Sequence, residues 1–70
     1  MKYGARNQWV GRVVEIKKGA VMSQVTVELA PGLRATSVLT LDSLRELGLR
    51  KNSRARVLVK AVNVLLTTED

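Results

Sequence analysis

The chain has 70 residues, a length that predicts a single domain spanning residues 1–70. It carries twelve lysines and arginines against six acidic residues, and the net charge of +6 indicates an anionic partner, either a small ion or a polymer. The lack of cysteine excludes disulfides and thiolate metal sites, and the lack of histidine removes the commonest metal ligand and general base.

The apolar content bears on stability and location. A chain of this length hides only about 60% of its unfolded surface, so its own core is a weak source of stability. We expect association of copies to supply further burial, since 46% of the residues are apolar. No apolar run reaches the roughly 18 residues of a membrane span, and Met1-Lys2 is followed by polar residues instead of a signal-peptide core. The cytoplasm is the expected location, without contact to a membrane.

The first half of the chain reads as two strands. Residues 9–17 alternate with a period close to two, as a half-buried strand does, and Gly11 marks a bulge or a close backbone approach. A turn is expected over residues 18–20. Residues 21–29 alternate more cleanly, with Ser23 as the polar exception on the apolar side.

A tight turn, a strand and a short helix follow. Ala30-Pro31-Gly32 predicts the turn because proline fixes φ and glycine accepts a positive φ. A third strand is expected over residues 33–39. A helix then begins near Thr40 or Asp42, either of which can accept from the amides of the first turn, and Gly48 supplies a left-handed stop.

The last two strands are expected over residues 54–60 and 62–67, after a turn at 51–53. The predicted fold is therefore mainly β: a five-stranded OB-like Greek-key barrel with one short helix between strands three and four. Several apolar residues fall on nominally outward positions, which other copies would cover, although scattered surface aliphatics are equally normal. These residues are Val13, Val38, Leu58 and Leu65.

Residues 4–9, G-A-R-N-Q-W, combine a cation, amide side chains and a large ring. Arg6 offers a planar fork of donors that suits an oxyanion, and Gly4 and Ala5 leave backbone amides uncovered. The plain alternative is the entry of a strand, with Trp9 as a core anchor and Arg6 in solvent.

Two further segments have donors for an anion. A helix start presents amides and the positive end of a dipole, and Thr40 and Ser43 would add hydroxyls there. The alternative is a plain cap at Thr40 with a solvated Ser43, and Asp42 is assigned to capping because a carboxylate would repel the ligand. Lys60 would add a second positive charge, although on sequence alone such a lysine is more often an edge-strand residue that discourages aggregation.

Four blocks occur in order: G-A-R-N-Q-W, then V-G-R-V-V-E-I-K-K-G, T-L-D-S-L-R-E-L-G-L and V-L-V-K-A-V-N-V. With them the chain resembles, from Lys2 to Leu66, the Mop or molbindin family of molybdate-binding, TOBE-like domains, which also occur in molybdate-responsive regulators and transporter ATPases. The resemblance implies a cytoplasmic protein that stores or buffers molybdate, with tungstate as an alternative anion and no organic cofactor. It also implies a homohexamer built as a trimer of dimers, with anions at the subunit interfaces.

The resemblance further implies two kinds of oxyanion site and no direct ligand for a metal cation. The interface site would consist of Gly4, Ala5, Arg6, Thr40, Ser43, Lys60 and Ala61. Of these, Thr40 and Ser43 would come from a neighbouring subunit. The position of Gly4 is usually a serine in the family, whose hydroxyl contact this chain lacks. A second site near a threefold axis would be built from Lys18, Gly19, Ala20, Val21, Met22 and Ser23. A turn of this composition also occurs in many unrelated proteins.

Catalysis is not expected, because no nucleophile–base pair or carboxylate dyad is visible. A nucleic-acid-binding OB-like module is the alternative function, and the basic charge suits it. Stacking platforms need aromatic side chains, however, and the chain has only Tyr3 and Trp9, so nucleic acid is not the expected partner. A subunit that only assembles with a larger partner and binds no ion is a third reading.

Overall fold

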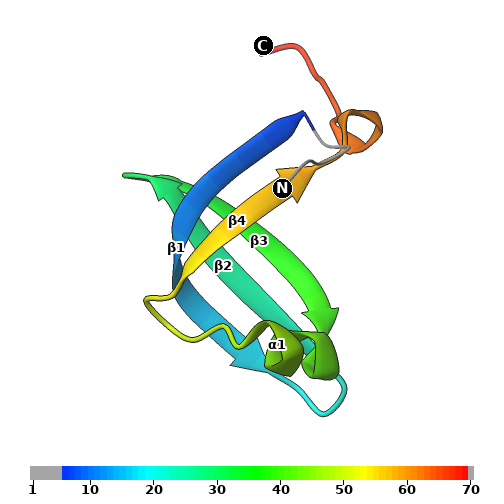
Figure 1. The fold of residues 1–70 in the computed structure, drawn as a ribbon. Helices are drawn as coiled ribbons and strands as arrows, with labels where there is room; N and C mark the ends of the chain where they lie inside the picture. The colour runs from blue at the N-terminus through cyan, green and yellow to red at the C-terminus, as the bar shows by residue number, and fades with distance from the viewer. Residues whose placement is uncertain (1–5, 70) are drawn as a thin grey trace.

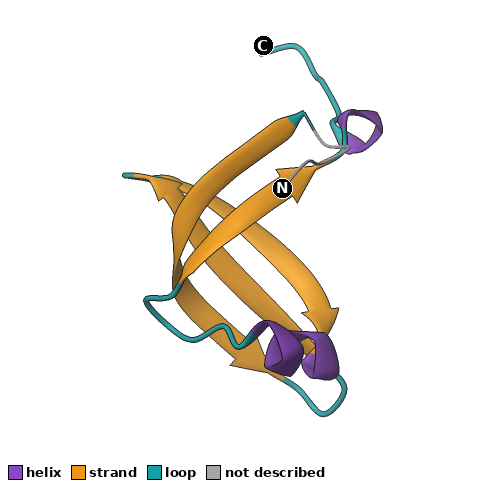
Figure 2. Ribbon diagram, in the orientation of Figure 1, coloured by secondary structure: helices purple, strands orange, loops and turns teal. Residues whose placement is uncertain are grey.

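A computed structural model describes residues 6–69 and shows a curled antiparallel sheet with α1 near one end (Figure 1). The strands lie in the order β3-β2-β1-β4. Figure 2 shows that strands make up most of the fold. The elements are β1 (Asn7–Lys18), β2 (Met22–Ala30), β3 (Leu33–Thr40), α1 (Leu41–Leu47), β4 (Arg54–Val59) and the 3₁₀ turn η1 (Ala61–Asn63). Within residues 6–69, no helix has the length and apolar character needed to cross a membrane.

The prediction of a fifth strand over residues 62–67 is wrong, and the described chain has a four-stranded sheet. After β4 the chain turns into η1, where the backbone N–H of Asn63 donates to the Lys60 carbonyl at 2.9 Å. It then leads away from the sheet (Figure 1), leaving Leu65 and Leu66 each 93% exposed. Residues 62–67 pair with no strand of this sheet, and an apolar composition without such pairing does not make a strand.

A bulge divides β1 into two halves. Residues 7–12 pair with β4 and residues 12–18 pair with β2, and the register with β2 shifts between Val13 and Glu15. The bulge lets Val13 turn into the core, where it is 0% exposed. The expectation that Val13 faces outward is therefore wrong, because the alternation on which it rested is interrupted here.

Gly11 lies where two backbones meet closely, as one of the two sequence interpretations predicted. A Cβ at this position would lie 2.4 Å from the Glu28 carbonyl oxygen and 2.7 Å from Cγ1 of Val27. Only glycine fits there without a shift of β2.

The core lies between the concave side of the sheet and α1. It consists of Val13, Val25, Val27 and Leu44. Ser23, the polar exception predicted on the apolar side, is 4% exposed and donates its hydroxyl to the Leu39 carbonyl at 3.1 Å. This bond satisfies a buried polar group that would otherwise be costly.

The short helix has the predicted position, and Gly48 ends it with a φ of +67°, which confirms the left-handed stop. Its N-cap is Thr40, so the assignment of Asp42 to capping is wrong. The Leu41 amide donates to the Val21 carbonyl at 2.7 Å, which fixes the start of α1 to the turn between β1 and β2.

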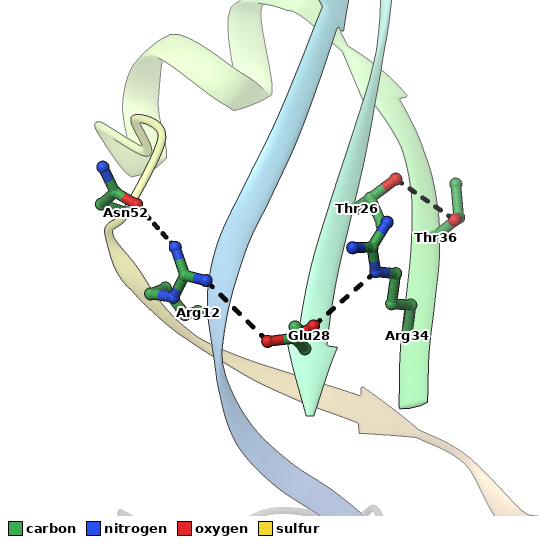
Figure 3. A network of polar contacts seen from close by, with 6 residues as sticks. All are labelled: Arg12, Thr26, Glu28, Arg34, Thr36 and Asn52. Carbon is green, nitrogen blue, oxygen red and sulfur yellow. Dashed lines mark hydrogen bonds and ion pairs between the residues drawn. The ribbon is translucent and has the colours of Figure 1, made fainter. Parts of the chain in front are cut away.

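A polar network on the other face of the sheet ties the α1–β4 loop to β1 (Figure 3). Arg12 donates to Asn52 Oδ1 at 2.6 Å, and its guanidinium also lies 3.8 Å from Glu28. Glu28 in turn lies 3.8 Å from Arg34, so one carboxylate is shared by two arginines. The backbone N–H of Asn52 donates to the Val13 carbonyl at 2.8 Å, which holds the loop against the bulge.

Candidate functional site

Arg6 and Lys60, the two cations of the predicted interface site, lie at the adjoining ends of β1 and β4. Asn7, the first residue of β1, pairs with Val59, the last residue of β4. Arg6 precedes Asn7 and Lys60 follows Val59, so each lies one residue beyond this pair, and both are exposed. Neither forms an ion pair with an acidic residue in the part of the chain that the structure describes. Two neighbouring positive charges without counter-charges favour an anion between them.

Ala61 lies beside this pair as the first residue of η1. The amide of a residue at that position has no acceptor within its own helix, so it is suited to donate outward. The structure therefore brings Arg6, Lys60 and Ala61 to one end of the molecule. The predicted site residues Gly4 and Ala5 lie outside the described residues.

Thr40 and Ser43 lie together at the start of α1. Thr40 Oγ1 accepts from the Ser43 amide at 3.1 Å and lies 2.8 Å from Ser43 Oγ, to which it donates. A hydroxyl has one proton, so Thr40 is occupied as cap and donor, while the exposed Ser43 hydroxyl keeps its own proton for an outside acceptor. The amides of Leu41 and Ser43 are also already bonded, to Val21 and Thr40.

A single chain does not bring these two groups together. The start of α1 is at the opposite end of the sheet from η1 and the end of β4 (Figure 1). A site that combines Arg6 and Lys60 with Ser43 therefore needs two copies of the chain.

The residues of the predicted second site are divided between two pockets. Lys18, Gly19, Met22 and Ser23 line one of about 290 Å³, together with Lys17, Gln24 and Val38. Ala20 and Val21 line another of about 280 Å³ with Thr40, Leu41, Asp42 and Arg45. The first pocket has two lysines, but the Ser23 hydroxyl is already bonded to Leu39. The second contains the Asp42 carboxylate, which disfavours an anion.

Sequence reasoning did not include Lys17 and Gln24 in this second site. They are direct cross-strand partners in the hairpin of β1 and β2. Counting the register outward from the turn at residues 18–20 would have placed them beside it. Among residues 6–69 there is no cluster of three or more carboxylates able to hold a metal ion.

The cap at Thr40 can be tested apart from any ligand. Thr40→Val removes the oxygen that accepts from the Ser43 amide, so we expect the free energy of unfolding to fall by about 1 kcal/mol. Thr40→Ser keeps this oxygen and should stay within a few tenths of a kcal/mol of the parent. Urea denaturation followed by circular dichroism measures both, and equal midpoints for valine and serine would contradict the capping role.

Comparisons with known proteins bear on what this arrangement binds. The family model described as the TOBE domain matches residues 4–66. Molybdenum-pterin-binding protein 2 of Clostridium pasteurianum is 41% identical over 66 residues, which cover 94% of this chain and 97% of that protein. The molybdenum transport protein ModE of Azotobacter vinelandii is 39% identical, and the match covers 94% of this chain but 24% of that protein.

Solved structures agree with the fold. MopII of Clostridium pasteurianum in an apo form superposes with a TM-score of 0.88 at 39% identity, covering 96% of this chain and 100% of that one. A molybdate-binding protein from Sporomusa ovata gives 0.89 at 31% identity, covering 97% and 100%. The cytoplasmic molybdate-binding protein ModG, solved with molybdate bound, gives 0.88 at 38% identity, covering 93% of this chain and 46% of that one.

Proposed function

Because the chain belongs to the TOBE domain family, we propose that residues 1–70 form one molybdate-binding domain that stores or buffers the anion in the cytoplasm. The observation that carries the proposal is the position of two cations, Arg6 and Lys60, at adjoining strand ends, with no ion pair to either within residues 6–69. Relatives named for molybdenum or molybdate match over almost the full chain, which supports this anion as the ligand.

The chemistry of the ligand fits the donors available. Molybdate is a tetrahedral dianion, so it is best held by two positive charges and several hydrogen-bond donors, with carboxylates at a distance. One copy supplies Arg6, Lys60 and the Ala61 amide, with backbone amides at Gly4 and Ala5. A second copy supplies the Ser43 hydroxyl, oriented by Thr40. Tungstate has the same shape and charge and is the expected competitor.

Association of copies is the second part of the proposal. A groove of about 390 Å³, lined mainly by apolar residues, opens between β2, β3, β4 and α1. Val62, Leu65 and Leu66 are at least 85% exposed, and Val38 and Leu58 are also exposed. So much apolar surface on a small chain is best explained by contact with other copies. We propose a homohexamer, built as a trimer of dimers, in which these contacts also bring the two halves of the site together.

The turn at residues 18–23 is proposed as a second, weaker oxyanion site. Lys17 and Lys18 give its pocket a positive charge. Its other donors are the Gln24 side-chain amide and backbone amides, of which that of Gly19 is already bonded to the Met22 carbonyl at 2.8 Å. We propose that the protein binds rather than transforms its ligand and uses no organic cofactor.

Isothermal titration of the purified protein with sodium molybdate at 50 and 200 mM salt tests the proposal, with light scattering to give the oligomeric mass. We expect saturable binding that changes little with salt, displacement by tungstate, and a mass of several chains. An absence of heat and of displacement would refute molybdate binding. Salt-sensitive binding of a single-stranded oligonucleotide, measured by anisotropy, would favour the nucleic-acid function instead.

A further inference from the structure

The rung that joins the start of β1 to the end of β4 has a bond beyond the usual backbone ladder. The Asn7 side-chain amide donates from Nδ2 to the Val59 carbonyl oxygen at 3.2 Å, across 52 positions in sequence. Asn7 is partly buried, and it is directly paired with Val59 as the outermost rung of the two strands. Its side chain therefore connects the two chain segments that carry Arg6 and Lys60.

We expect this rung to open more easily than the three-stranded part of the sheet. From residue 7 to residue 11, β1 pairs with β4 but not with β2, so this part is a two-stranded ribbon. A ribbon of two strands is marginal in water, and its free end frays first. The Arg6 and Lys60 charges are one residue beyond a rung whose Cα atoms are about 5 Å apart, and their repulsion adds to the tendency to open.

We propose that Asn7 is a positioning residue of the oxyanion site: its bond to the Val59 carbonyl keeps the outermost rung closed so that Arg6 and Lys60 face one dianion together. The inference rests on the proposed function and adds a residue that acts by joining the two strand ends and not by binding the anion itself. Asparagine suits this task because its neutral amide donates without adding a charge that would compete with the ligand.

The test is a double-mutant cycle on molybdate affinity, with Asn7→Val as the main variant. Valine has nearly the size of asparagine, favours strands and lacks the donor, so the fold is expected to persist. Asn7→Val should weaken binding about tenfold, a cost typical of losing a group that orients a ligand of an ion. In a Lys60→Ala background the same change should cost less than about twofold, because no second cation remains to be aligned.

The outcomes separate this inference from the proposed function. If the parent protein gives no molybdate heat, the proposed function fails and the inference fails with it. If the parent binds and Asn7→Val binds equally well, or loses the same factor with and without Lys60, the positioning role alone is refuted. Asn63→Ala, at an exposed asparagine of η1, is the matched control and should leave affinity unchanged. Should the valine variant not fold, Asn7→Ala, which also lacks the donor, replaces it in the same cycle, with the same two results deciding.

Discussion

Replacing Lys60 with alanine is expected to weaken molybdate binding by about 10- to 100-fold, and replacing Arg6 should cost at least as much. A hydrogen bond to a charged group contributes about 1.5–3 kcal/mol, and each 1.4 kcal/mol is a factor of ten in affinity. Arginine can donate two bonds to one oxyanion, so its loss should be the larger. Isothermal titration of each variant against molybdate measures the effect.

The matched controls for these variants are Lys51→Ala and Arg50→Ala, which remove the same charges from exposed positions of the α1–β4 loop. They change the overall charge equally, so they should bind within about twofold of the parent if attraction is local. Equal losses in all four variants would mean that overall charge, and not a site at the ends of β1 and β4, attracts the anion.

Gly11→Ala should have the largest effect on stability in the chain. The new Cβ would lie 2.4 Å from the Glu28 carbonyl oxygen, which belongs to the backbone and cannot rotate away. Forcing an atom into a packed site costs about 3 kcal/mol, and a domain of this size has only about 3–5 kcal/mol from its core. We expect a variant that is largely unfolded at 37 °C, as measured by thermal and urea denaturation.

Gly32→Ala is the control for Gly11→Ala. Gly32 has a φ of +79°, and a Cβ there would meet no atom within 4 Å, so the cost is confined to the left-handed backbone at about 1 kcal/mol. A Gly11→Ala protein that is as stable as Gly32→Ala would show that β1 and β2 separate easily at this point.

The sequence predicted correctly those elements that depend only on neighbouring residues. The strand expected over residues 21–29 is β2 at 22–30, and the stop at Gly48 follows from a backbone requirement of one residue. Val13 and Val14 are neighbours and both apolar, so the sequence allows either to face the core. The pairing with β2 decides for Val13, and that pairing comes from distant residues. Four of residues 62–67 are apolar, which permits a strand, but the chain leads away from the sheet after η1 and this segment pairs with none of its strands.

Some features of the candidate site could likewise be predicted from neighbouring residues, and others depend on distant ones. The helix start at Thr40 could be predicted from residue type and spacing. The proximity of Arg6 to Lys60 depends on the antiparallel pairing of β1 with β4, which no pattern near either residue encodes. The sequence places Asn7 next to Arg6 in the G-A-R-N-Q-W block, but its bond to Val59 is visible only in three dimensions. Contact of these residues with an anion stays a prediction.

The bulge at Val14 makes chain length, more than residue identity, the sensitive variable in β1. Each half of the strand keeps its own inward and outward parity, one set by β4 and the other by β2. Deleting Val14 itself would leave a regular ladder with both halves facing as they do now, because Arg12, Val13 and Glu15 already oppose three consecutive residues of β2. Deleting a residue on either side of the bulge would instead reverse the inward and outward sides of part of the strand.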